Sequence, residues 1–167
     1  MTTVDLFAIK EKIVQILKAD TTNLWDSTPS DKTKFRKIES GSPSPKAIQE
    51  PPLPRLWVTS DETLALVKPL GVIESNASKG EEYDIRLKII FVVEAKDGSA
   101  TEEKIDDFTK SIINNLEANY DIRTPSGAES TRLAESSQVI AIRDLPNMFK
   151  GDRVRGRVIS FQVIVRA

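Results

Sequence analysis

The chain has 167 residues, of which 39% are apolar and 29% are charged, with a net charge of −1. This length and composition are typical of one globular domain. The small net charge gives no overall attraction to nucleic acid or anionic membranes. It contains neither cysteine nor histidine, which excludes disulfides, thiolate nucleophiles, histidine bases and nearly all transition-metal sites. We therefore expect a structural or binding protein, not an enzyme, with no cofactor and no metal.

The first predicted element is an amphipathic helix over residues 3–20. Its N-terminus can be capped by Thr2 or Thr3, with Asp5 in the first turn. One face carries the apolar residues at helical spacing, namely Leu6, Ile9, Ile13, Ile16 and Leu17.

Residues 21–54 show no periodicity and are rich in Ser, Thr, Pro and Lys. A stretch this long without structure of its own is unusual inside a compact domain and is normally functional. Because a single preceding helix cannot form a separate core, we interpret residues 1–167 as one domain with a long excursion at 21–54. Its end, "PPLP" at 51–54, resembles a polyproline ligand, but we favour a stiff approach to the next strand.

Three strands are predicted next, and the last is the clearest. "RLWVTS" forms the first, and "ETLALVKPLGVIES" the second, interrupted at Pro69. "YDIRLKIIFVVEA" alternates strictly. One face carries apolar side chains throughout, and the other changes from charged to apolar halfway along, so we expect one end of that face to be covered. The apolar face comprises Tyr83, Ile85, Leu87, Ile89, Phe91 and Val93.

A second helix and two more strands complete the chain. "TEEKIDDFTKSIINNLEAN" is helical, "SQVIAIRDL" reads as a strand, and "RVRGRVISFQVIVRA" is a strong final strand. The predicted fold class is α+β: a mostly antiparallel sheet with two amphipathic helices packed on one face and a long proline-rich loop. The predicted buried stripe of the helix is Ile105, Phe108, Ile112, Leu116 and Tyr120.

No apolar run approaches the ~18 residues that cross a bilayer. The N-terminus lacks the basic segment and apolar block of a secretory signal. We therefore expect a soluble protein with no membrane partner that is not exported by that route.

Two charged patches stand out. The acidic patch is Glu102, Glu103, Asp106 and Asp107, and the segment from Glu94 to Asp121 has a net charge of −5. It lacks the ligand pattern of a calcium loop, so we interpret it as a solvated helix start or an interface.

The basic patch is Arg153, Arg155 and Arg157 on the final strand. No aromatic residues alternate with these arginines, so specific nucleic-acid binding is disfavoured. No glycine-rich phosphate loop occurs in the chain. A protein interface or a solvated edge is favoured.

The order of these elements resembles the tail-terminator (tail-completion) proteins of tailed viruses and the related caps of contractile injection systems. The resemblance covers most of the chain. Its strongest piece is the charged-then-apolar strand "YDIRLKIIFVVEAKDG" followed by the acidic helix start "TEEKIDDF". It implies a structural virion protein, assembled in the host cytoplasm, that forms a ring, commonly a hexamer. Such a ring caps the head-proximal end of the tail tube, ends tube polymerisation and docks neck or head-completion proteins.

A ring needs two unlike surfaces that meet between neighbouring copies. We expect the acidic and basic patches to lie on separate surfaces and to orient assembly. Apolar anchors in the excursion would supply most of the affinity, since exposed ion pairs contribute only ~0–1 kcal/mol each. These anchors are Trp25, Phe35, Ile38, Leu53 and Pro54. Two alternatives stay open: another head–tail connector or neck protein, and an adaptor domain that presents the proline-rich ligand.

Overall fold

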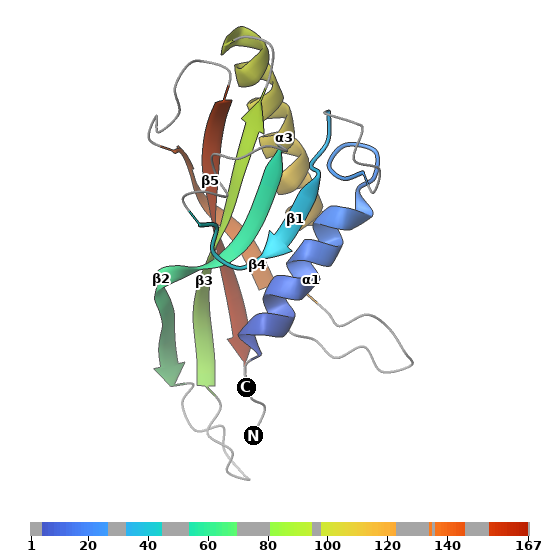
Figure 1. Cartoon of the computed structure of the whole chain (residues 1–167). Coiled ribbons are helices and arrows are strands. Elements are labelled where there is room, and N and C mark those ends of the chain that lie inside the picture. The colour runs from blue at the N-terminus through green and yellow to red at the C-terminus, as the bar shows by residue number, and fades with distance from the viewer. Residues whose placement is uncertain are drawn as a thin grey trace.

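The computed structural model describes the chain with gaps, and everything below refers to the described residues. They are residues 5–26, 33–44, 54–69, 81–94, 98–122, 134, 136–145 and 154–166. Two helices and five strands occur there (Figure 1). In chain order they are α1 (Leu6–Ala19), β1 (Lys37–Ser40), β2 (Arg55–Pro69), β3 (Glu81–Glu94), α3 (Gly98–Ala118), β4 (Ser136–Asp144) and β5 (Val154–Arg166).

The strands form one sheet in the order β1-β2-β3-β5-β4, in which only β1 and β2 pair in parallel. Both helices pack on the same face of this sheet, and their apolar residues join the core-facing residues of β1, β2, β3 and β5 in one cluster. The predicted α+β class with a mostly antiparallel sheet and two helices on one face is therefore confirmed. Neither helix is long and apolar enough to cross a membrane.

Helix α1 follows the predicted apolar spacing, with Ile9, Ile13 and Leu17 almost fully buried. Its cap differs from the prediction. Asp5 is the N-cap, and its carboxylate accepts a hydrogen bond from the Ala8 backbone N at 2.9 Å. Aspartate is as good a cap as threonine. Because Asp5 takes the cap position in place of Thr2 or Thr3, the helix begins at Leu6, later than predicted.

The predicted strands 55–60 and 62 onward are one strand, β2, and this is a correction. The pairing with β3 shifts register between Ser60 and Ala65. The boundary that the sequence suggested between two strands is therefore an irregularity within one strand. Pro69 is the last residue of β2 and lies beyond the stretch that pairs with β1, so it is at an edge of the described sheet, where a proline is tolerated.

The excursion at 21–54 is also corrected, because it contains β1. Lys37–Ser40 pairs in parallel with Arg55–Val58. Gly41 ends this strand at φ 119°, a conformation that favours glycine. Sequence does not predict β1, because its four residues show no apolar alternation. Only the pairing with β2 defines this strand.

Strand β3 alternates as predicted. Ile85, Leu87, Ile89, Phe91 and Val93 are in the core, with Tyr83 packed against it. On the opposite face Val92 and Trp57 form a second, smaller cluster with Ile90, Leu145 and Val154, so the apolar end of that face is covered. The second face carries the charged side chains of Arg86 and Lys88 at its other end.

Helix α3 buries Ile105, Phe108, Ile112 and Leu116 as predicted, but not Tyr120. The helix ends at Ala118, two residues before Tyr120, which is 58% exposed. Because the chain has already left the helix, the 3.6-residue period no longer places that side chain on the buried stripe.

Candidate functional site

The two sides of α3 carry most of the charged residues that the sequence singled out. One side faces β4 and β5. There Arg157, whose side chain is only 17% exposed, joins three elements. Its Nη1 donates to Asp106 Oδ1 at 2.7 Å and to Thr109 Oγ1 at 3.0 Å, and its Nε donates to Asp144 Oδ1 at 2.8 Å. Arg157 therefore ties β5 to α3 and to β4 within one chain.

Burial alone would lower the pKa of the Arg157 guanidinium. The hydrogen bonds to Asp106 and Asp144, together with the attraction of both carboxylates, raise the pKa by more, so the net shift is upward. Arg157 therefore keeps its charge while its side chain contacts α3 and β4.

Arg155, two residues before Arg157 in β5, makes the same kind of contact: its Nη1 donates to Glu102 of α3. These contacts correct the expectation of two separate charged surfaces. The side chains of Arg155 and Arg157 share the helix-facing side of β5 with Ile159, and α3 runs above them. Glu102 and Asp106 of the acidic patch therefore pair with Arg155 and Arg157 of the basic patch inside one copy. Arg153 lies outside the described residues.

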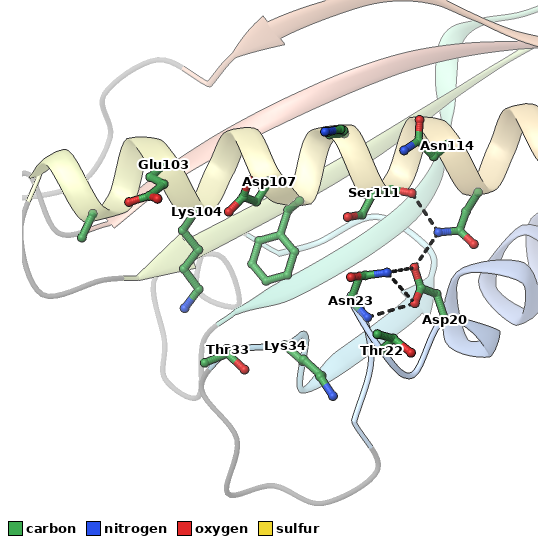
Figure 2. A pocket seen from close by; sticks show the side chains of 14 residues that line it. Asp20, Thr22, Asn23, Thr33, Lys34, Glu103, Lys104, Asp107, Ser111 and Asn114 are labelled. Carbon is green, nitrogen blue, oxygen red and sulfur yellow. Dashed lines mark hydrogen bonds between the residues drawn. The ribbon is translucent and has the colours of Figure 1, made fainter.

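The other side of α3 borders an open cleft of about 840 Å³, and the residues that line it opposite α3 are Asp20, Thr22, Asn23, Thr33 and Lys34 (Figure 2). Glu103 and Asp107, the rest of the acidic patch, line this cleft and are exposed. Charges of both signs meet here, because Lys34 and Lys104 also line it. The Lys34 ammonium donates to the Thr21 carbonyl at 2.7 Å.

Asp20 closes one end of the cleft and joins α1 to α3. Its carboxylate accepts hydrogen bonds from the Asn23 backbone N at 2.9 Å and from the Asn115 side-chain amide at 2.8 Å (Figure 2). Burial raises the pKa of Asp20, but the hydrogen bonds from Asn23, Asn115 and Thr22 lower it by more, so the net pKa lies below 3.8. This end of the cleft is thus a structural joint.

Lys104, like Lys34, contacts its own chain at the border of the cleft. The Lys104 ammonium donates to the Glu94 carbonyl at 3.1 Å and lies 6.0 Å from the centre of the Phe108 ring. Within the described part of the chain, no group of three or more His, Cys, Asp or Glu side chains is placed to hold a metal ion. The mixed charges of the cleft suit a polar contact with another protein better than the binding of a defined small ligand.

Two of the predicted apolar anchors of the excursion, Phe35 and Ile38, belong to the core of their own chain, which is a further correction. Phe35 is fully buried, stacks on Phe108 at a centroid distance of 4.2 Å and meets Phe91 edge-on at 5.8 Å. Ile38 of β1 is 1% exposed. Once β1 pairs with β2, both side chains come to lie beneath the helices, so neither is available to a neighbouring copy.

Trp25 and Pro54 are held locally as well. Trp25 forms an isolated bridge with Phe35, and the Lys18 ammonium lies 5.6 Å from the centre of its ring. Pro54 is buried, and its carbonyl accepts a hydrogen bond from the Arg36 backbone N at 3.0 Å. Leu53 and the rest of "PPL" lie outside the described residues.

The structure reveals different apolar surface residues that the sequence analysis missed. Phe7 on α1 is 66% exposed, and Ile140 and Ile142 on β4 are 41% and 47% exposed. The available signals were weak: Phe7 falls off the helical stripe, and Ile140 and Ile142 belong to an apolar run, "VIAI", that looks buried. Sequence alone does not show that β4 is the outermost strand of the sheet.

Comparison with known proteins leaves function open. No protein-family model matches the chain. No curated protein matches it either. One solved structure with 13% sequence identity aligns over 93% of this chain and 90% of its own, with a TM-score of 0.38. At that level of similarity the alignment carries no inference about what this chain does.

Proposed function

We propose that this chain is a structural protein of a viral tail or contractile injection system, which forms a ring on the head-proximal end of the tail tube. The ring, built from six copies, ends tube polymerisation and offers a docking surface to neck or head-completion proteins. The protein is assembled in the host cytoplasm and remains in the virion. It has no catalytic role.

One observation carries this proposal. The large apolar side chains that remain exposed include Phe7 on α1 and Ile140 and Ile142 on β4, a strand at the edge of the sheet. A head-to-tail ring requires two unlike surfaces on each subunit. Exposed apolar groups of this size commonly mark protein contacts when they gather together.

The order of elements supports the same proposal. An N-terminal helix, a group of strands, a second helix and two closing strands follow one another as the family resemblance implies. Both helices cover the same face of the sheet, which leaves the two edges for contacts between copies.

The oligomeric state tests the ring. Light scattering would give the mass of the purified protein across a range of concentrations, and negative-stain images would give its shape. The proposal predicts a discrete oligomer with a central hole, either in solution or when purified tail tubes are added. A protein that stays monomeric in solution and does not bind to tubes would contradict the proposal.

A further inference from the structure

Strand β4 contains one residue more than its pairing with β5 requires. Val139 pairs with Phe161, and Ala141 pairs with Ser160, the adjacent residue of β5, so Ile140 has no partner of its own in the pairing. An extra residue of this kind in one strand of an antiparallel pair is a β-bulge. Ile140 is exposed and belongs to neither hydrophobic cluster of the described residues. Packing of its side chain therefore does not account for the extra residue.

The fold of the chain itself does not need the extra residue either. Side chains alternate between the two faces along a strand. Val139 packs against the main core cluster, and Asp144 bonds to Arg157 on the same, helix-covered side. When Ile140 is left out of the count, Val139 and Asp144 fall on the same face of a regular strand. A strand without Ile140 would thus keep these side chains in place and keep its pairs with β5.

The outer edge of β4 is open, because β4 is the last strand on its side of the described sheet. Its first seven residues, 136–142, contain no charged residue, no proline and no glycine. Three of them, Val139, Ile140 and Ile142, are β-branched and favour strands. An uncharged segment of this kind at an open edge is a site at which strands of other molecules pair. Most of β4 thus lacks the charges and prolines that protect other edge strands.

The bulge interrupts this edge in its middle. Along a regular strand, the backbone N–H and C=O groups of every second residue point to the same edge. The extra residue shifts this repeat, so the groups before and after Ile140 are out of phase for an incoming regular strand. The strand is thereby divided into two stretches, 136–139 and 141–144. Each stretch is shorter than the usual strand of roughly five to six residues.

We propose that the bulge at Ile140 protects the outer edge of β4 from pairing with a strand of another molecule. The protection comes from the backbone, and the Ile140 side chain has no part in it. Contacts through side chains remain possible at this edge, so the inference is compatible with the proposed ring and does not depend on it. Open-ended extension of the sheet from one molecule to the next is what the bulge prevents.

Deletion of Ile140 tests this protection, and Ile140→Ala is the matched control. The deletion removes the bulge, whereas Ile140→Ala keeps the extra residue and shortens only its side chain. In the deletion variant, light scattering should show a mass that rises beyond that of wild type, and infrared spectra should show added intermolecular β-structure. Ile140→Ala should show neither change. Circular dichroism and urea unfolding report whether each variant is folded.

A second substitution identifies the edge responsible. Ile142→Lys added to the deletion should return the mass to that of wild type, because a lysine on an edge strand opposes strand pairing. Ile142 is exposed, so this change does not remove a core side chain. Growth that persists in the combined variant would show that the deletion acts at some other surface, which would contradict the inference.

Hydrogen exchange of the wild-type protein gives a readout that needs no variant to fold. The amides of β4 that do not bond to β5 should exchange faster than those that do, also at concentrations at which a ring forms. Protection of these outward-facing amides in both stretches, 136–139 and 141–144, would show that a strand pairs across the bulge.

Two further results would overturn the inference. One is a folded deletion variant whose mass equals that of wild type at every concentration. The other is growth of Ile140→Ala to the same extent as the deletion, because the side chain and not the bulge would then be responsible. Whether wild type forms a ring on tail tubes is decided by a different measurement, so failure of this inference leaves the proposed function standing.

Discussion

Replacement of Phe35 by alanine distinguishes a core residue from an interface residue. The structure places this side chain at 0% exposure between the rings of Phe108 and Phe91. Truncation of a buried phenylalanine costs about 3–5 kcal/mol in the free energy of unfolding, from lost transfer energy and from the cavity left behind. The aromatic contacts account for roughly 0.5–1.5 kcal/mol of such a loss per pair.

This loss is large compared with the stability of a domain, about 5–15 kcal/mol. For a chain of this size it corresponds to a fall of roughly 6–20 °C in the midpoint of thermal unfolding. The assay is urea unfolding of Phe35→Ala and wild type, at a protein concentration at which both are monomeric, because assembly would add apparent stability. Fluorescence of Trp25 and Trp57 reports the transition.

Phe7→Ala is the matched control, since Phe7 is 66% exposed. Surface substitutions usually change stability by no more than about 0.5 kcal/mol. If Phe35→Ala and Phe7→Ala unfold at the same urea concentration, Phe35 is not a core residue. The excursion at 21–54 would then again be a candidate for contact between copies.

Two further predictions concern the joints of the fold. Because the folded pKa of Asp20 lies below its ordinary 3.8, its contribution to stability is present above that value and is lost as the pH falls through the folded pKa. Unfolding measured from pH 6 to 2.5 should show a smaller acid loss in Asp20→Asn than in wild type; parallel curves would contradict this. Gly156→Ala should cost about 1–3 kcal/mol by overpacking, because its Cβ would overlap the Leu145 side chain and lie 3.2 Å from the Phe91 carbonyl. Gly156→Ala combined with Leu145→Ala should lose less than the sum of the two single losses in urea unfolding, and strict additivity would refute the overlap.

The elements with strong periodicity could be predicted from sequence because their own residues determine which side is buried. The apolar face of β3 and the stripe from Ile105 to Leu116 are examples. Strand β1 could not be predicted, since its sequence, "KIES", has a single apolar residue and becomes a strand only by pairing with β2.

The candidate site was harder to predict than the fold. The sequence singled out charged residues but not their partners, because Arg157 and Asp106 are 51 positions apart and only the packing of α3 on β5 brings them together. The same holds for Phe35, which becomes a core residue through contacts with Phe91 and Phe108. The ring and its partners stay predictions.

Tail-tube length measures the central claim most directly. Purified tube protein would be polymerised with increasing amounts of this chain, and tube lengths would be measured in negative-stain images. The account predicts shorter tubes as the chain is added, each with a ring of density at one end. Tubes of unchanged length without a terminal ring, at saturating amounts of folded protein, would contradict it.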